Sequence, residues 1–235
     1  PRELIRNGAT LYYGNQEAWG TIEANAEDVK NKIFEVINKT GAQKVNIIAH
    51  SKGGLDARYM ISKLGMEDYV ASLTTMSTPH RGSFVMDFVK KLPPKLVGFI
   101  GRRINKSFKL LGDKNPDFET ASKQFYTESA VQFNKEVKNS KKVHYQSYTT
   151  IMSRPWSDYI LFFPYIIGLF SRNKNDGLVS IDSAKWGEFK GVIKTKRARG
   201  ISHGDIIDLR RHDYKGFDVR EFYVKMVAEL KQMGF

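Results

Sequence analysis

The passage from an apolar run through a glycine-rich turn into a helix, around residue 50, constrains the fold most. Residues 45–49 (VNIIA) are apolar apart from Asn46, which suits a buried parallel strand. Residues 55–64 carry a helical pattern that ends at Gly65. Ser51 stands between them in the sequence AHSKGG. We therefore expect a sharp strand-to-helix turn with a serine on it.

The rest of the chain repeats this alternation of strand and helix patterns. Strands that alternate with helices predict a mostly parallel sheet with helices on both faces, which is an α/β fold. The expected helices are 1–6, 24–39, 55–64 and 217–233, and the expected strands are 10–13, 45–49, 70–76 and 143–151.

Composition narrows the class of protein. A length of 235 residues suits a single domain, 1–235, and 41% hydrophobic residues argue against a disordered chain. The absence of cysteine excludes disulfides, thiolate nucleophiles and cysteine metal sites. The longest apolar run, 159–170, is too short to span a bilayer and contains Pro164, so we expect a soluble globular protein. No signal-peptide pattern follows Pro1, and the compartment is not predicted.

Ser51 is the first candidate for chemistry. A nucleophilic serine on a strand-to-helix turn needs small residues two positions away on each side, and Ala49 and Gly53 fill those places. The amide of Lys52 would lie at a helix N-terminus, where it could donate to an oxyanion. On these five residues alone, an ordinary helix N-cap explains Ser51 equally well. The flanking strand and helix favour catalysis.

A nucleophilic serine needs a base and an acid that orients the base. In this architecture they follow the serine in the order acid, then histidine, which leaves His203 and His212. His212 lies among charged residues, whereas His203 lies in a loop between two glycines. Asp176 lies in a turn sequence, NKNDG, that can hold a carboxylate at a strand end. Taken singly, Asp176 and His203 are more simply explained as a turn residue and a surface loop residue.

Four segments together resemble the signatures of bacterial triacylglycerol lipases and esterases of the α/β-hydrolase fold. They are 49–59 (AHSKGGLDARY), 77–83 (STPHRGS), 175–179 (NDGLV) and 202–205 (SHGD), in the order found in that family. No structural requirement ties four such loops together, so the set is specific. Together they span most of the chain.

The resemblance implies roles for individual residues. It makes Ser51 the nucleophile, Asp176 the acid and His203 the base, with Lys52 as an oxyanion amide and no cofactor needed for the chemistry. Related lipases hold a structural calcium ion through an aspartate two residues after the catalytic histidine. Asp205 has that position, and Asp158 is the candidate for a second ligand. A capping role for Asp205 remains the alternative.

One family feature is missing from the sequence. Relatives carry a His-Gly pair upstream of the serine, and the residue after that pair supplies the other oxyanion amide. No such pair precedes Ser51. We therefore expect that the first strand of the sheet and its loop lie outside this sequence.

Residues 84–138 form an expected helical insertion, with the position of a lid. Within it, 95–111 combines an apolar stripe with five basic residues and no acidic one, which suits contact with an anionic lipid surface. A helix packed on the domain with a solvated basic face fits the pattern equally well. The aromatic segment 155–170 could line an acyl pocket or a dimer contact, although burial in the core is the simpler expectation.

These observations predict a serine carboxylic-ester hydrolase. It would resemble lipases and cleave acylglycerols or related lipid esters through an acyl-enzyme on Ser51. The alternatives are a short-chain esterase of the same fold, or a non-catalytic basic module that binds membranes or polyanions. The net charge of +13 and a basic cluster motivate the last alternative. That cluster lacks the interleaved aromatics of nucleic-acid binders, so we expect no nucleic-acid partner, and the oligomeric state is not predicted. Its members are Lys190, Lys194, Lys196, Arg197 and Arg199.

Overall fold

A single parallel sheet organises the chain. The computed structural model describes all residues except 171–172, 196–198 and 210–215. Within that part of the chain, four parallel strands lie in the order β1-β2-β3-β4, so each strand pairs with the next one in sequence. The predicted mostly parallel sheet is confirmed. The strands are β1 (Val45–His50), β2 (Val70–Met76), β3 (His144–Thr150) and β4 (Glu188–Ile193).

Two details of the strand prediction are wrong. Residues 10–13 form no strand, because nothing in the described chain pairs with them and a strand pattern without a neighbour makes no ladder. Strand β4 was not expected, since its sequence EFKGVI mixes charges and a glycine with the apolar residues. It completes the sheet as an edge strand beside β3.

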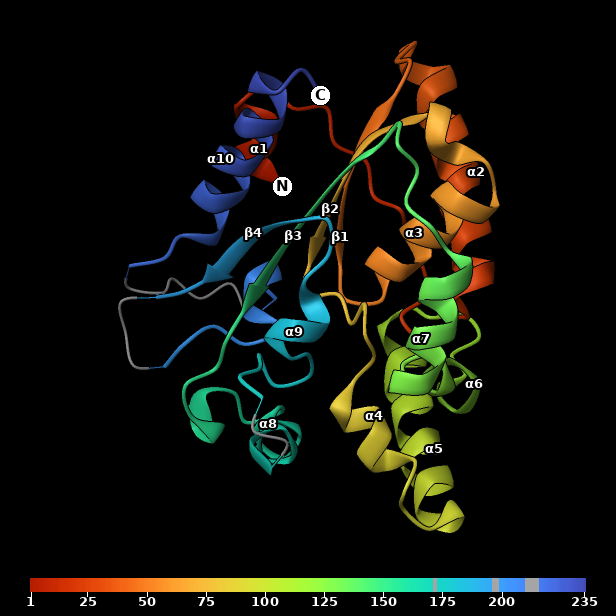
Figure 1. Cartoon of the computed structure of the whole chain (residues 1–235), viewed down its shortest axis with the longest axis vertical. Coiled ribbons are helices and arrows are strands. Elements are labelled where there is room, and N and C mark those ends of the chain that lie inside the picture. The colour runs from red at the N-terminus through yellow and green to blue at the C-terminus, as the bar shows by residue number, and fades with distance from the viewer. Residues whose placement is uncertain (171–172, 196–198, 210–215) are drawn as a thin grey trace.

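Helices α2 (Ile22–Thr40) and α3 (Gly53–Lys63) cover one face of the sheet (Figure 1). The side chain of Thr21 accepts a hydrogen bond from the amide of Ala24, which caps the start of α2. Gly41 ends this helix with a φ of 71°, a left-handed conformation that glycine adopts without strain. The apolar sides of both helices meet β1 and β2 in the main core cluster.

Helix α10 (Val219–Gln232) covers the opposite face, together with α1 (Arg2–Arg6) (Figure 1). The side chain of Asp218 caps α10 by accepting from two amides of its first turn. Met226 of α10 packs in a second core cluster with Met76 and Tyr148 of the sheet. The sheet is thus buried on both faces, as predicted.

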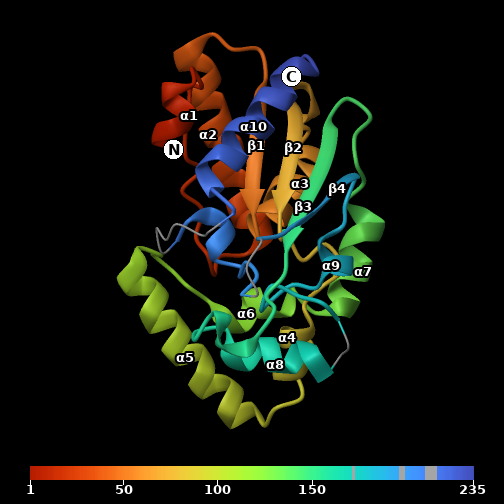
Figure 2. The same cartoon turned by 90° about the vertical axis from the view of Figure 1, so that its left-hand side faces the viewer.

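The remaining helices belong to the connections that follow β2 and β3. Figures 1 and 2 show α4, α5 and α8 beyond the ends at which β1, β2 and β3 finish. The expected insertion 84–138 is helical; the connection after β3 supplies α8 and α9. These helices are α4 (Phe84–Val89), α5 (Pro94–Leu111), α6 (Phe118–Lys123), α7 (Thr127–Glu136), α8 (Phe162–Phe170) and α9 (Ile181–Ala184), and the short 3₁₀ turns are η1 (Met66–Asp68), η2 (Pro155–Ser157) and η3 (Asp205–Ile207).

The aromatic segment 155–170 was expected mainly in the core, and this expectation is wrong for most of its large side chains. Tyr165 is buried, but Tyr159 and Phe170 are each more than 80% exposed. The segment forms η2 and α8 at the end of the domain, where one side of the helix has no covering element in the described chain. None of the described helices is both long and apolar enough to cross a membrane.

Candidate active site

Ser51 lies on the turn between β1 and α3, at the carboxyl end of the first strand. Its φ of 52° is left-handed, which costs a non-glycine residue on the order of 1–2 kcal/mol. The amide of Ser51 still donates to the carbonyl of Met76 at 3.0 Å, so the sheet holds the turn in place. The predicted strand-to-helix turn is present, and its serine is partly exposed.

The requirement for a small residue falls one position later than the sequence motif indicates. A Cβ on Gly53 would meet that of Ala49 at 3.8 Å, which is an ordinary contact. A Cβ on Gly54 would lie only 2.2 Å from the hydroxyl oxygen of Thr78. The close approach is therefore between α3 and the loop after β2, and Gly54 is the residue that permits it.

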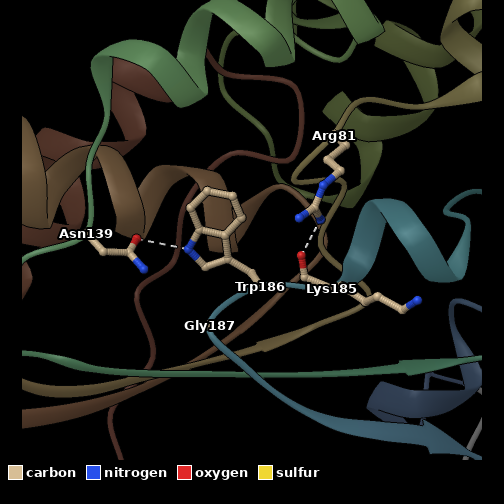
Figure 3. A pocket seen from close by; sticks show the side chains of 5 residues that line it. All are labelled: Arg81, Asn139, Lys185, Trp186 and Gly187. Atoms are coloured by element: carbon tan, nitrogen blue, oxygen red, sulfur yellow. Dashed lines mark hydrogen bonds between the residues drawn. The ribbon is translucent and has the colours of Figure 1, made fainter.

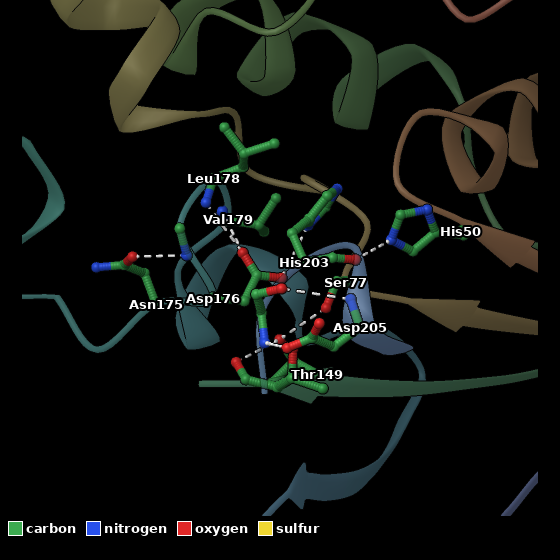
Figure 4. Close-up of polar contacts among 12 residues, drawn as sticks. His50, Ser77, Thr149, Asn175, Asp176, Leu178, Val179, His203 and Asp205 are labelled. Carbon is green, nitrogen blue, oxygen red and sulfur yellow. Dashed lines mark hydrogen bonds and ion pairs between the residues drawn. The ribbon is translucent and has the colours of Figure 1, made fainter. Parts of the chain in front are cut away.

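Asp176 and His203 come together although 27 residues separate them. Nδ1 of His203 lies 2.8 Å from Oδ2 of Asp176 (Figure 4). Because an ionised carboxylate only accepts, Nδ1 carries the proton and Nε2 of His203 is left to act as a base. The amide of His203 also donates to the carbonyl of Asp176, at 2.8 Å. Both side chains are buried.

The surroundings of Asp176 favour its ionised form. Its Oδ1 accepts from the amides of Leu178 and Val179, at 3.1 and 2.9 Å. Burial alone would raise the pKa of Asp176, but the His203 ring and these hydrogen bonds outweigh it, and the pKa lies below its usual value. The hydroxyl of Ser77 also donates to Asp176. Asp176 is thus a carboxylate suited to orient a histidine.

His50 joins the serine turn to the loop of His203. Its Nε2 donates to the backbone carbonyl of His203 at 2.9 Å, and the two rings lie 4.5 Å apart (Figure 4). Burial, and then the His203 ring, lower the pKa of His50 to about 3, so His50 stays neutral. No local pattern in the sequence indicates this contact, because the two residues lie 153 positions apart. His203 therefore lies beside the residue that precedes Ser51.

A buried ion pair supports the first turn of α3. Nζ of Lys52 lies 2.7 and 2.9 Å from the two carboxylate oxygens of Asp56, and Asn25 of α2 donates to the same carboxylate. Burial raises the pKa of Asp56 to about 6, against the attraction of Lys52. The pair ties α3 to α2 directly below the turn, and its residues lie one and five positions after Ser51.

His80 is held in place by contacts of its ring with neighbouring side chains. Its ring bonds Thr75 and Arg58, at 3.0 and 3.2 Å, and stacks on Trp186. Burial, and then the guanidinium groups of Arg58 and Arg81, hold the pKa of His80 well below its usual value. These contacts give His80 a packing role.

The two aspartates expected to bind calcium lie on either side of Ser202. The Ser202 hydroxyl donates to Asp158 and its amide donates to Asp205, both at 2.9 Å. A guanidinium nitrogen of Arg199 lies 2.6 Å from the same oxygen of Asp205. Calcium takes six to eight oxygen ligands. The described residues contain no group of three acidic or histidine side chains that could hold a metal, so they do not form such a cage, and calcium binding stays a prediction of the resemblance.

A shallow cleft of about 260 Å³ opens elsewhere, and none of the predicted catalytic residues lines it (Figure 3). Trp186 donates from its ring nitrogen to Asn139, at 2.9 Å. The guanidinium of Arg81 donates to the backbone carbonyls of Asp182 and Lys185. These polar groups already have partners within the protein, so the cleft suggests no second site of chemistry.

Three residues considered in the sequence lie outside the described part of the chain. They are His212, excluded above as a base, and Lys196 and Arg197 of the basic cluster. Arg199 of that cluster turns inward to Asp205, while Lys190 lies 3.4 Å from Glu188. The cluster therefore does not form one continuous basic surface in the part of the chain that the structure describes.

Comparison with known proteins identifies the family. The chain is 32% identical to triacylglycerol lipase 2 of Saccharomyces cerevisiae over 99% of this chain and 72% of the yeast protein. The chain belongs to the triacylglycerol lipases. It is also 37% identical to a triacylglycerol lipase of Vibrio cholerae, over 40% of this chain and 30% of that protein. The family expected from the four segments is thus confirmed.

Residues 5–151 also match the family described as palmitoyl protein thioesterase. This match covers more than half of the chain, so the lipase belongs to that family as well. Both descriptions concern the hydrolysis of acyl bonds. The prediction of a lipase-like serine hydrolase is therefore confirmed.

Solved structures confirm the α/β-hydrolase fold. The Staphylococcus hyicus lipase superposes with a TM-score of 0.72 at 15% identity, over 99% of this chain and 88% of that one. The mature lipase BlEst2 of Bacillus licheniformis gives 0.63 at 20% identity, over 89% of this chain and 78% of that one. At these identities the likeness concerns the fold.

Proposed function

We propose that this lipase cleaves acyl esters through a covalent acyl-enzyme on Ser51. The observation that carries the proposal is the Asp176–His203 pair at 2.8 Å, held by His50 against the turn that bears Ser51. Asp176 fixes the proton on Nδ1 of His203, which leaves Nε2 to take the proton of the serine hydroxyl. A site of this kind needs no redox or organic cofactor.

The reaction then has two halves. Ser51 attacks the ester carbonyl while His203 accepts its proton, and His203 passes that proton to the leaving alcohol. Water, activated by the same histidine, next attacks the acyl-enzyme and releases the acid. The amide of Lys52, at the start of α3, stabilises the developing oxyanion. One such donor lowers the activation barrier by about 3 kcal/mol.

Lipid esters are the substrates that the surface near the site supports best. Helix α5 exposes Leu110 and Leu111 at 82% and 78%, and α8 exposes Phe163 and Phe170 at 74% and 84%. Large apolar side chains that are this exposed suit contact with a lipid surface. Acylglycerols dissolve in lipid, so an apolar surface beyond the strand ends would bring the site to them.

The charge of α5 favours an anionic lipid surface. Five basic residues on this helix are exposed, and it contains no acidic one. A hollow of about 570 Å³ at its end is lined by Lys106, Lys109 and Lys114 among others. Basic groups beside exposed leucines are what an interfacial helix needs in order to bind anionic lipid. We therefore expect transient contact of α5 with such a surface, and a lid role for 84–138 remains part of this proposal.

Thioester hydrolysis is the second candidate, and the palmitoyl protein thioesterase match favours it. Oxygen esters and thioesters pass through the same acyl-enzyme, so the site geometry serves both. The leaving group distinguishes them. Comparison of palmitoyl esters with palmitoyl thioesters on the same protein would rank the two substrates.

The proposal is tested by hydrolysis of p-nitrophenyl esters of short and long acyl chains, of triolein emulsions and of a palmitoyl thioester. Ser51→Ala should lower kcat at least about a thousandfold, with the fold retained by circular dichroism. Ser140→Ala is the control, since Ser140 lies in the loop before β3 and, in the described part of the chain, its hydroxyl only accepts from the amide of Lys142; it should retain covalent labelling by a fluorophosphonate. Turnover that persists in Ser51→Ala would contradict the role of this serine.

A further inference from the structure

The loop that carries His203 is fastened along its length to residues 151–157. The amide of Ile201 donates to the carbonyl of Ile151 at 2.8 Å. The carbonyl of Arg199 accepts from the amide of Ser153 at 3.1 Å and from the hydroxyl of Ser157 at 2.6 Å. These contacts place the side chain of Arg199 next to the turn that begins at Ser202.

Two carboxylates are buried at this turn. Asp205 is 1% exposed and Asp158 is 4% exposed, and the two meet through Ser202. Buried carboxylates are costly unless cations or hydrogen bonds compensate them. The guanidinium of Arg199, 2.6 Å from Asp205, supplies a positive charge from within the protein.

We propose that Arg199 is the internal cation that fixes the catalytic-histidine loop. It takes the part that the resemblance assigned to calcium, so the loop keeps its shape without the metal. Only the activity measurement in the test below rests on the proposed function.

The contacts show how Arg199 acts on His203. One oxygen of Asp205 accepts from both Arg199 and the amide of Ser202, which closes the turn from Ser202 to Asp205 around His203. The amide of Asp205 donates to the carbonyl of Ser202, at 3.1 Å, and completes that turn. In the described part of the chain, the hydrogen bonds and ion pair of Arg199 go to Asp205, Ser153 and Ser157 and not to Ser51 or His203, so it is a positioning residue. Its loss should change kcat more than KM.

The decisive experiment compares wild type with Arg199→Ala in ester hydrolysis and in calcium binding by isothermal titration calorimetry. Wild type should retain its kcat in EDTA and should bind no calcium at millimolar concentration. Arg199→Ala should lose about ten- to hundredfold in kcat with KM little changed, as is usual when a supporting contact is removed. It should gain calcium binding, and millimolar calcium or guanidinium should restore part of its kcat.

Matched variants distinguish the effect of where the arginine lies from the effect of its charge. Arg6→Ala removes an exposed arginine whose ion pair with Glu3 has the same 2.6 Å length, and it should change neither readout. Arg199→Lys keeps the charge and should retain most of the activity. Asp205→Asn should lose activity that calcium does not restore, because the carboxylate itself is gone. If Arg199→Ala does not fold, Arg199→Lys and Asp205→Asn carry the comparison.

Three results would overturn the proposal. They are calcium binding by wild type with loss of activity in EDTA, an unchanged kcat in Arg199→Ala, and a lower kcat in that variant with no response to calcium or guanidinium. If wild type hydrolyses no ester, the proposed function fails. The calorimetric comparison then still decides whether Arg199 stands in for the metal.

Discussion

Helices α2 and α5 have nearly the same length and both have an apolar stripe, yet the protein uses them differently. Helix α2 has 19 residues and buries six of them. Helix α5 has 18 residues and buries only Gly101, where Phe118 packs against the helix backbone. Periodicity therefore shows that a helix has an apolar side, but not what covers that side.

The charged residues of α2 and α5 also differ. Helix α2 mixes acidic and basic residues, including exposed pairs such as Lys32 with Glu35 at 2.8 Å. The charged residues of α5 are all basic. A helix that contributes to the core needs only a solvated outer side, whereas α5 has leucines and cations exposed together. This difference fits a role in stability for α2 and the lipid contact that we propose for α5.

The largest expected contrast is in stability. Ile33→Ala in α2 removes a side chain that is 6% exposed, and should lower the free energy of unfolding by about 2–4 kcal/mol. Phe99→Ala in α5 removes a larger side chain that is 51% exposed, and should cost less than about 0.5 kcal/mol. Urea unfolding followed by circular dichroism measures both. Equal costs would show that α5 packs on the domain as firmly as α2.

The next contrast is in activity on lipid. Replacement of Leu110 and Leu111 by serine should lower the hydrolysis of esters in anionic vesicles by about tenfold, since each exposed leucine can bury apolar area in lipid. Hydrolysis of a soluble short-chain ester should not change. Ile5→Ser, at an exposed apolar position on α1, serves as the control. A parallel loss on both substrates would place α5 in the site rather than on a lipid surface.

The smallest effect concerns the pH dependence of stability, which should depend on His50 and not on α5. In the unfolded chain His50 takes up a proton near pH 6.5, but in the folded protein only near pH 3. Between these values the unfolded state binds more protons, so stability falls as pH falls. His50→Gln should reduce the slope of unfolding free energy against pH by about 1.4 kcal/mol per pH unit in that window. Urea unfolding at pH 7, 6 and 5 measures it, with Lys106→Gln on α5 as the control. An unchanged slope in His50→Gln would contradict the neutral state of His50.

The sequence predicts the periodic parts of the fold well. Strand β2 has the predicted bounds, and α2, α3, α5 and α10 differ from their predictions by at most two residues at each end. Regular spacing decides the helices among these elements, because apolar residues at every third or fourth position share one side of a helix. Strand β4 and the exposure of α8 depend instead on which neighbours are near, and spacing along the chain does not contain that information.

In the candidate site, too, residues in local motifs were predictable and long-range contacts were not. Motifs brought Ser51, Asp176 and His203 forward as a set, and the structure places Asp176 and His203 in contact. The sequence places Arg199 only in a basic cluster. Its pairing with Asp205 could not be predicted, because it depends on a loop conformation that no periodicity describes. His50 was visible only as a neighbour of the serine, since its partner lies 153 residues away.

The strand order also has a consequence for biosynthesis. Each strand pairs with the one before it in the chain, so the sheet can grow one strand at a time as the polypeptide leaves the ribosome. Ser51 is in place once β1 and α3 have formed. The proposed acid, Asp176, follows β3, and the proposed base, His203, follows β4, so the base is the last of the three to be made. A nascent chain would therefore carry the proposed nucleophile without its base until residue 203 has been made.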